Sequence, residues 1–258
     1  MPVIQSGGSA INVVLDGDER APVLILSNSL GTDHGMWEPQ VVPLAKHFRL
    51  VRYDRRGHGR SAVTAPPYSM GQLGRDVLAI MDGLNIKKAN WCGLSMGGMV
   101  GQWLGANAPE RFDRLILCNT SCFYADKDAW NDRITTVKKD GVAPLAAAVA
   151  GRWFTQGFIA REPAQVARLR KMVEETSVDG YLGCCAAIRD MDHREMLRKI
   201  SAPTLIIAGK QDVATPVANG EFIRDNIPGA KMTVLDAAHI SNVEQADKFT
   251  AEVLGFLN

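Results

Sequence analysis

The sequence lacks the features that mark several classes of protein. No apolar run approaches the length of a membrane span, and the first residues show no positively charged region followed by a long apolar stretch, as a secretory signal peptide would. The formal net charge is only +1, and lysine and arginine form no block that would attract nucleic acid or an anionic membrane. We therefore expect a cytoplasmic protein that binds neither nucleic acid nor a membrane.

Cysteine is also scarce, and its distribution argues against a disulfide framework. Five cysteines among 258 residues are an odd number, which suggests reduced thiols in a chain without a signal peptide. Cys118 and Cys122, or the neighbours Cys184 and Cys185, could be metal ligands, but no histidine or second cysteine pair completes a tetrahedral set. We interpret the cysteines as small core residues and expect no metal site.

The composition is that of a soluble globular protein, with 46% hydrophobic and 22% charged residues, and the length suits one α/β domain. Short apolar runs bounded by turn residues recur along the chain. Such runs are typical of strands buried on both faces of a parallel sheet. They cover residues 23–26, 50–53, 89–94, 114–119, 204–209 and 231–236.

Helical patterns lie between several of these runs. Apolar residues recur at helical spacing from Leu73 to Leu84, and Ser69 with Gln72 offers a capping box at the start. The same spacing recurs near the end of the chain, at Ala246, Phe249, Val253 and Leu257. The alternation of strands and helices predicts an α/β fold with a doubly wound, mostly parallel sheet.

The alternation stops between about residues 122 and 199. Helical segments at 163–177 and 194–200 follow each other there with no clear strand between them. The stretch lacks the Pro/Ser/Gly low complexity of a linker. We therefore expect a core formed by residues 1–121 and 200–258, and a helical lid inserted at 122–199.

A serine flanked by glycines follows the run at 89–94. The segment from Gly93 to Gly97 reads G-x-S-x-G and opens a helix-like run that ends near Pro109. In that context the serine occupies a sharp strand-to-helix turn, which pushes its hydroxyl out at the carboxyl edge of the sheet. Side chains at the flanking positions would collide across so tight a turn, so glycine is required there. Ser95 is the candidate nucleophile.

A serine hydroxyl needs a histidine to accept its proton, and the histidine needs a carboxylate to hold it. His239 lies between the last predicted strand and the last predicted helix, and Asp212 follows the strand at 204–209 directly. The order Ser95, Asp212, His239 is the one expected for this fold. The rivals are Asp190 and Asp192 in the insertion, Asp236 at a strand end, and the histidines at 34, 47, 58 and 193.

These motifs together make the chain resemble the α/β-hydrolase family over nearly its whole length. The elbow GLSMGG, the loop YDRRGHGRS, the segment GKQDVATP and His239 occur in the family's order. Where that family usually carries His-Gly after its first long strand, this chain has Asn28-Ser29. The stretches SNSLGTDHGMW, RWFT and DAAHISNVEQAD make it similar to the enol-lactone hydrolases of the β-ketoadipate pathway. The resemblance implies an α/β-hydrolase fold with an inserted helical lid.

The resemblance also implies a reaction. Ser95 would attack the carbonyl of a small lactone while His239 accepts the proton and Asp212 fixes the imidazole. The backbone N–H groups of Leu30 and Met96 would stabilise the oxyanion. No metal or organic cofactor is needed.

A lactone of that pathway carries a carboxylate, and burying this charge requires a cation. Trp130 and Arg133 stand three residues apart and share one face of a helix, where they offer a flat wall for the ring and a fork for the carboxylate. Matching residues in the proteins that this chain resembles favour the pair. Alternatively, Arg133 is a solvated arginine beside a packing tryptophan, or Arg152, next to Trp153, supplies the cation.

Other functions share these motifs. A carboxylesterase, a cofactor-free haloperoxidase or perhydrolase, or a carbon–carbon bond hydrolase would have the same Ser-Asp-His set. A hydrolase-like protein could also hold a small ligand under its lid without turnover. Dehalogenases and epoxide hydrolases of this fold use an aspartate nucleophile, which Ser95 excludes.

Overall fold

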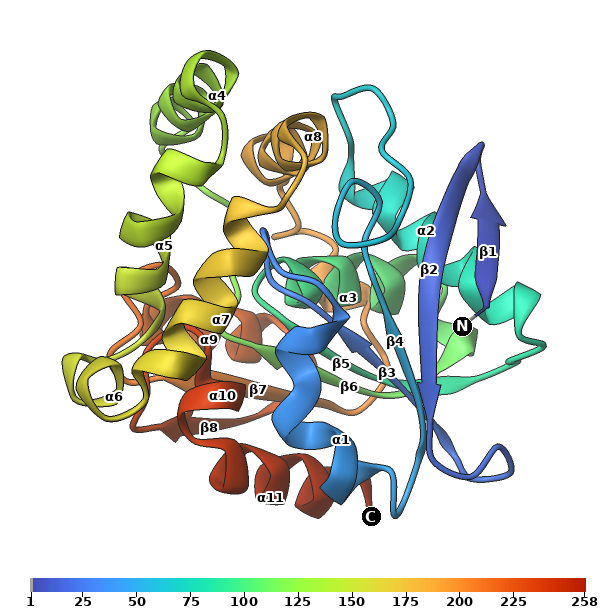
Figure 1. The fold of residues 1–258 in the computed structure, drawn as a ribbon. Helices are drawn as coiled ribbons and strands as arrows, with labels where there is room; N and C mark the ends of the chain where they lie inside the picture. The colour runs from blue at the N-terminus through green and yellow to red at the C-terminus, as the bar shows by residue number, and fades with distance from the viewer. Residues whose placement is uncertain (1) are drawn as a thin grey trace.

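The computed structural model describes residues 2–258, and a twisted sheet runs through the middle of the molecule (Figure 1). Within those residues the strands lie in the order β1-β2-β4-β3-β5-β6-β7-β8. Neighbouring strands from β4 to β8 are parallel, whereas β2 pairs in antiparallel with both β1 and β4. The strands are β1 (Val3–Ser6), β2 (Ser9–Asp16), β3 (Val23–Ser27), β4 (Arg49–Tyr53), β5 (Ala89–Leu94), β6 (Phe112–Cys118), β7 (Thr204–Gly209) and β8 (Lys231–Leu235).

The predicted doubly wound, mostly parallel sheet is confirmed, and all six predicted runs form strands, β3 to β8. The central strands β5 and β7 are buried at every position, which is why they read as continuous apolar runs. The five cysteines are free thiols buried in the core.

The N-terminal hairpin has no counterpart among the predicted runs. β1 and β2 turn at Gly7 and Gly8, which have φ angles of +50° and +78° that glycine adopts without strain. In β1 the apolar Val3 is exposed and the polar Ser6 is buried, so this strand does not show the apolar run of a buried strand. The edge position of β1 therefore hides this strand from a search for buried strands, whereas β2 lies between β1 and β4 and is mostly buried.

Helices cover both faces of the sheet (Figure 1). One face carries α1 (Glu38–Leu44) packed against α11 (Ala246–Leu257), and the other carries α2 (Met70–Gly83) packed against α3 (Met96–Asn107). The predicted start of α2 is confirmed, since the Ser69 side chain accepts a hydrogen bond from the Gln72 N–H at 3.1 Å. The remaining helices after β7 are α9 (Val217–Asn226) and α10 (Ser241–Glu244).

A run of helices fills the stretch between β6 and β7, above the carboxyl end of the sheet (Figure 1). An isolated antiparallel bridge between Phe123 and Asp192 brings the two ends of this stretch together. The lid boundaries at 122 and 199 stay a prediction. The helices are α4 (Asp128–Asp140), α5 (Ala146–Trp153), α6 (Gln156–Arg161), α7 (Pro163–Glu174) and α8 (Val178–Asp190).

The helix expected over residues 194–200 is wrong. The structure has turns there and only a short 3₁₀ helix at Leu197–Lys199. The Arg194 side chain and N–H both turn back onto the Asp192 carboxylate, and Pro203 then disfavours helical backbone before β7. The apolar residues of this segment, Leu197 and Ile200, are buried by a turn and a short 3₁₀ helix and not by an α-helix.

Among residues 2–258, no helix is both long enough and apolar enough to cross a membrane.

A buried ion pair fastens the N-terminal hairpin to α2. The Arg56 guanidinium contacts both oxygens of the Asp76 carboxylate, at 2.7 Å through Nε and 2.5 Å through Nη2. The Ser6 hydroxyl donates to the same carboxylate at 2.6 Å. The side chains of Arg56 and Asp76 are only 2% and 4% exposed. Loss of one partner would therefore leave an uncompensated charge in the interior.

We predict that Asp76→Ala destabilises the protein by about 3–5 kcal/mol, because it strands the Arg56 charge in the interior. Asp82 is the matched control, since it pairs with Arg111 at 2.8 Å but its side chain is 67% exposed. Asp82→Ala should cost no more than about 1 kcal/mol. Urea denaturation measures both changes, and equal losses would show that burial of the Arg56 pair adds nothing.

Candidate active site

Ser95 occupies a strained turn between β5 and α3. Its backbone has φ of 57° and ψ of −115°, a region that residues with side chains rarely adopt. The Ser95 N–H donates to the Cys118 carbonyl at the end of β6, at 2.8 Å. The turn therefore holds Ser95 at the carboxyl edge of the sheet, as the G-x-S-x-G pattern predicts.

Gly93 and Gly97 have no room for a side chain, because backbone atoms lie against them. A Cβ at Gly93 would come closer than 3.0 Å to the carbonyl oxygen of Gly97, and a Cβ at Gly97 would come as close to the carbonyl oxygen of Ser27. Backbone atoms cannot give way as a flexible side chain can. The two glycines thus let β5, the turn and the loop after β3 meet around the serine.

His239 and Asp212 meet at the same edge. His239 Nδ1 lies 2.8 Å from Asp212 Oδ2, and both side chains are almost fully buried, at 4% and 0% exposure. Asp212 comes from the loop after β7, and His239 comes from the loop between β8 and α10. The other nitrogen of His239 is left for the cavity, because Nδ1 is engaged by the carboxylate.

The Asp212 carboxylate is held from every side. Its Oδ1 accepts from the N–H groups of Ala214 and Thr215 at 2.8 and 2.9 Å. Its Oδ2 accepts from the Thr215 hydroxyl at 2.6 Å and from the Asn119 amide at 3.0 Å. Burial alone would raise the pKa of Asp212, but the charge and hydrogen bond of His239 and the bonds from Thr215 hold this pKa well below its usual range.

Asn119 and Thr215 are absent from the predicted site. Asn119 also donates to the Ala238 carbonyl at 3.1 Å and accepts from the Ser241 hydroxyl at 2.6 Å, so it ties Asp212 to the His239 loop. The position of Asn119 in the sequence is a signal of this role, because a polar residue directly after a buried strand lies at the carboxyl edge of the sheet.

The rival acids lie elsewhere. Asp190 and Asp192 pair with Arg189 and Arg194 at the surface, and the exposed Asp236 accepts a hydrogen bond from Gln211 at 3.0 Å. Among the other histidines, His193 is buried beside Gln102 and His47 is exposed. The structure therefore brings only Asp212 of these carboxylates to His239.

A second buried carboxylate supports the loop of His239. Glu244 accepts from the N–H of Ala238 at 2.9 Å and from both the N–H and the hydroxyl of Thr155, between α5 and α6. The Ile240 N–H donates to the Trp153 carbonyl at 3.0 Å. The loop of His239 is thus joined on both sides of the histidine to the helices above the sheet.

A cavity of about 300 Å³ opens in front of these residues. It is lined from the sheet edge by Ser29, Leu30, Ser95 and His239, and from the helices above by Trp130 and Arg133, among others. The predicted serine, histidine and helical residues therefore share one cavity.

The two predicted substrate-binding residues lie against each other. The Arg133 guanidinium carbon is 5.0 Å from the centroid of the Trp130 ring, a cation–π distance. Burial raises the pKa of the neighbouring Tyr181 to about 12, although the charge of Arg133 acts to lower it. Arg152, the other candidate cation, is exposed and lines the same cavity.

Leu30 and Met96 come from two loops that touch. Met96 follows Ser95 as the first residue of α3, and the N–H of Gly97 donates to the Asn28 carbonyl at 3.1 Å. Asn28 and Leu30 belong to the loop after β3. This bond sets the Leu30 loop against the turn of Ser95.

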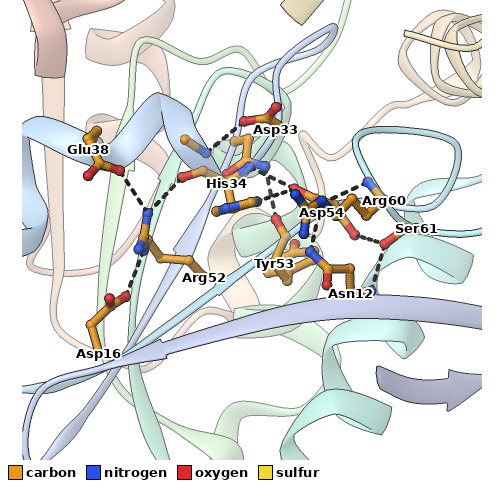
Figure 2. Close-up of polar contacts among 12 residues, drawn as sticks. Asn12, Asp16, Asp33, His34, Glu38, Arg52, Tyr53, Asp54, Arg60 and Ser61 are labelled. Carbon is orange, nitrogen blue, oxygen red and sulfur yellow. Dashed lines mark hydrogen bonds and ion pairs between the residues drawn. The ribbon is translucent and has the colours of Figure 1, made fainter. Parts of the chain in front are cut away.

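The loop after β3 is anchored by a polar network that the sequence does not reveal (Figure 2). Asp54 Oδ1 accepts from the N–H and Nδ1 of His34, both at 2.8 Å. Its Oδ2 accepts from Asn12 at 2.9 Å and from the Arg60 N–H at 3.0 Å. Burial alone would raise the pKa of Asp54, but the hydrogen bonds from His34 and from the Arg60 N–H lower it, and the bond to Asp54 raises the pKa of His34.

Asp33, His34 and Asp54 place three potential metal-ligand atoms within 4.8 Å of one another. The Asp54 oxygens are already taken by four hydrogen bonds, and Asp33 Oδ1 accepts from the Gly35 N–H at 2.7 Å. The hydrogen bonds of Asp33, His34 and Asp54 therefore stabilise the loop after β3.

Arg55 and His58 also hydrogen-bond to the loop after β3. Arg55 donates to the carbonyls of Asn28 at 2.7 Å and Ser29 at 3.3 Å. His58 Nε2 accepts from the Gly31 N–H at 3.1 Å, so this imidazole must be neutral. Burial, helped by the charge of Arg55, lowers the pKa of His58 to about 3.

Comparison with known proteins agrees with this geometry. The sequence pattern of the alpha/beta hydrolase fold matches residues 22–246, and the chain belongs to the α/β-hydrolase family. Within it, the chain is 43% identical to 3-oxoadipate enol-lactonase 2 of Acinetobacter baylyi, over 95% of this chain and 91% of that protein. It is 42% identical to 3-oxoadipate enol-lactonase 1 of the same organism, over 97% and 94%. The crystal structure of the enol-lactonase from Burkholderia xenovorans LB400 superposes with a TM-score of 0.97 at 43% identity, covering 99% of both chains. The chain is thus a hydrolase similar to enol-lactonases throughout its length.

We predict that Asp212→Asn lowers kcat by up to about 10⁴-fold, because an amide holds the wrong tautomer of His239. Asp236→Asn is the control, since its carboxylate contacts Gln211 at the surface. Hydrolysis of an aryl ester measures both. A large loss with Asp236→Asn and none with Asp212→Asn would exclude Asp212 as the partner of His239.

The buried neutral His58 makes stability depend on pH. The unfolded imidazole takes up a proton near its ordinary pKa of about 6.5, but the folded one does so only near 3. The unfolded state therefore binds more protons between these values, and the free energy of unfolding falls by up to roughly 1.4 kcal/mol per pH unit as pH drops through this window. His193, whose pKa burial lowers to about 4, adds to the slope.

We predict that His58→Gln, whose amide oxygen replaces Nε2 as acceptor, flattens this slope. Urea denaturation from pH 7.5 to 4.5 measures it, with His47→Gln at an exposed position as the control. Parallel stability curves for wild type and His58→Gln would show that His58 is not the group responsible.

Proposed function

We propose that this protein hydrolyses the 3-oxoadipate enol-lactone of the β-ketoadipate pathway, with Ser95 as nucleophile, His239 as base and Asp212 as the carboxylate that holds His239. The observation that carries the chemistry is the 2.8 Å hydrogen bond between His239 and Asp212 beside a cavity that Ser95 and His239 both line. The substrate follows from the enol-lactonases that resemble the chain over more than nine-tenths of its length.

In the first half-reaction, the Ser95 oxygen bonds to the lactone carbonyl carbon and its proton passes to His239. The tetrahedral oxyanion is stabilised by the N–H groups of Leu30 and Met96. The ring carbon–oxygen bond then breaks, and the enol oxygen takes the proton from His239. Tautomerisation of this enol to a ketone removes the group that could close the ring again.

In the second half-reaction, His239 takes a proton from water, whose oxygen attacks the acyl group on Ser95. Collapse of the second oxyanion releases a carboxylic acid, and the proton returns to the serine. The low pKa of Asp212 keeps it ionised throughout, so it stabilises the imidazolium each time His239 is charged.

The substrate carboxylate requires a cation in the cavity. Arg133 is half-buried and its guanidinium lies over the Trp130 ring, so it is pre-organised and partly removed from water. Arg152 is more exposed and would pair more weakly. We therefore assign the carboxylate to Arg133 and the lactone ring to the face of Trp130.

We predict that Arg133→Lys lowers kcat/KM for the enol-lactone by about 10-fold or more, while hydrolysis of a neutral aryl ester changes far less, because only the lactone carries a carboxylate. Arg152→Lys should have the smaller effect on both substrates. Initial rates on the two substrates measure this selectivity.

Controls separate the parts of this proposal. Ser95→Ala should abolish both activities and labelling by a fluorophosphonate. Equal losses on the lactone and the aryl ester in Arg133→Lys would remove Arg133 from carboxylate binding. A wild-type protein that is labelled at Ser95 and cleaves aryl esters but not the enol-lactone would overturn the proposed substrate and favour a carboxylesterase.

A further inference from the structure

Two threonine hydroxyls contact the two peptide groups whose N–H groups form the proposed oxyanion hole. The Thr120 hydroxyl donates to the Ser95 carbonyl at 2.7 Å. The Thr32 hydroxyl donates to the Ser29 carbonyl at 2.9 Å. We propose that Thr32 and Thr120 are positioning residues that aim the N–H groups of Leu30 and Met96 at the oxyanion, an inference that rests on the function proposed above.

The link between each hydroxyl and its N–H is the planar peptide. The Ser95 carbonyl and the Met96 N–H belong to one peptide unit, and in a trans peptide the two point in opposite directions. A hydroxyl that holds the carbonyl on one side therefore fixes the N–H toward the other. The Ser95 carbonyl also accepts from the Met99 N–H at 3.1 Å, in the first turn of α3.

The Ser29–Leu30 peptide is held in the same way. Besides the Thr32 hydroxyl, the Ser29 carbonyl accepts from Nη1 of Arg55 at 3.3 Å. All of these donors lie on the carbonyl side of the peptide, so the Leu30 N–H points away from them. Ser29 and Leu30 both line the cavity that contains Ser95.

The competing acceptors of the two hydroxyls are weaker. The Thr32 hydroxyl is also 3.4 Å from the sulfur of Met36, a poor acceptor, and the Thr120 hydroxyl is 3.5 Å from the Ser121 carbonyl. Each hydroxyl has one proton, and the shorter contacts to Ser29 and Ser95 take it.

Burial makes this arrangement effective. Thr32 and Thr120 are 1% and 3% exposed, so water does not compete for the two carbonyls. Donors fixed before the reaction need no reorganisation when charge develops, which is the source of oxyanion stabilisation. Thr120 follows β6 and supports the turn of Ser95 after β5, whereas Thr32 lies in the loop after β3 and supports the Leu30 side of the hole.

The test compares valine, which keeps the shape and removes the hydroxyl, with serine, which keeps the hydroxyl. We expect Thr32→Val and Thr120→Val each to lower kcat about 10-fold, less than the roughly 100-fold or more for loss of an oxyanion donor, and to change KM less than 2-fold. Affinity for a boronic acid, which forms a tetrahedral adduct with Ser95, should fall in parallel with kcat. Thr32→Ser and Thr120→Ser should restore both quantities.

Thr250 provides the matched control, because its buried hydroxyl donates to the Ala246 carbonyl at 2.7 Å on α11, away from the cavity. Thr250→Val should leave kcat and boronic acid affinity unchanged. If a valine variant does not fold, the alanine variant is compared with the serine variant at the same position.

The outcomes distinguish this inference from the proposed function. Valine variants with the kcat of Thr250→Val, or serine variants as slow as valine variants, would overturn the role of the hydroxyls while Ser95→Ala still shows the enzyme to be a serine hydrolase. All rates are measured on the enol-lactone and on an aryl ester, so failure of the lactone alone overturns the substrate and leaves the hydroxyl comparison readable. A wild-type protein that cleaves neither ester and resists fluorophosphonate would overturn both.

Discussion

The left-handed backbone of Ser95 is the constraint on which the rest of the structure depends. A non-glycine residue in this conformation costs about 1–3 kcal/mol and persists only where its surroundings determine it. Here hydrogen bonds determine it: the Ser95 N–H donates to the Cys118 carbonyl, and the Ser95 carbonyl accepts from the Thr120 hydroxyl and the Met99 N–H. The turn places Ser95 at the cavity, so in the function proposed above a single local geometry supplies both the nucleophile and, through the next N–H, an oxyanion donor.

The other half of the site depends on buried polar groups. The loop after β3 crosses the carboxyl edge without regular secondary structure, so its backbone groups need partners from side chains. Asp54, Arg55 and His58, all in the loop after β4, supply them, with carboxylate, guanidinium and neutral imidazole each matched to donors or acceptors of that loop. A neutral acceptor is possible at His58 only because burial and Arg55 suppress its protonation.

A feature could be predicted from the sequence when the residues that determine it lie close together along the chain. Buried strands, the Ser69 cap and the turn of Ser95 depend on neighbours within a few residues, and all are present. Asp212 and His239 could be proposed because strand ends share one sheet edge. The pairs Arg56–Asp76 and Thr155–Glu244 join residues 20 and 89 positions apart without any local pattern, so only the fold reveals them. The prediction of a helix at residues 194–200 was wrong because the contact of Arg194 with Asp192 favours a turn there, whatever the spacing of the apolar residues.

In the proposed function, the residues that react and the residues that select the substrate come from different parts of this chain. Ser95, Asp212 and His239 stand on loops at the sheet edge, whereas Arg133 and Arg152 come from helices above it. Under this proposal, different helices would change the substrate and leave the hydrogen bonds of His239 intact, except at one point. Glu244 binds both the joint between α5 and α6 and the residue before His239, and Ile240 bonds to Trp153. These hydrogen bonds join the helices to the loop of His239, so the position of the proposed base and the shape of the cavity are set together.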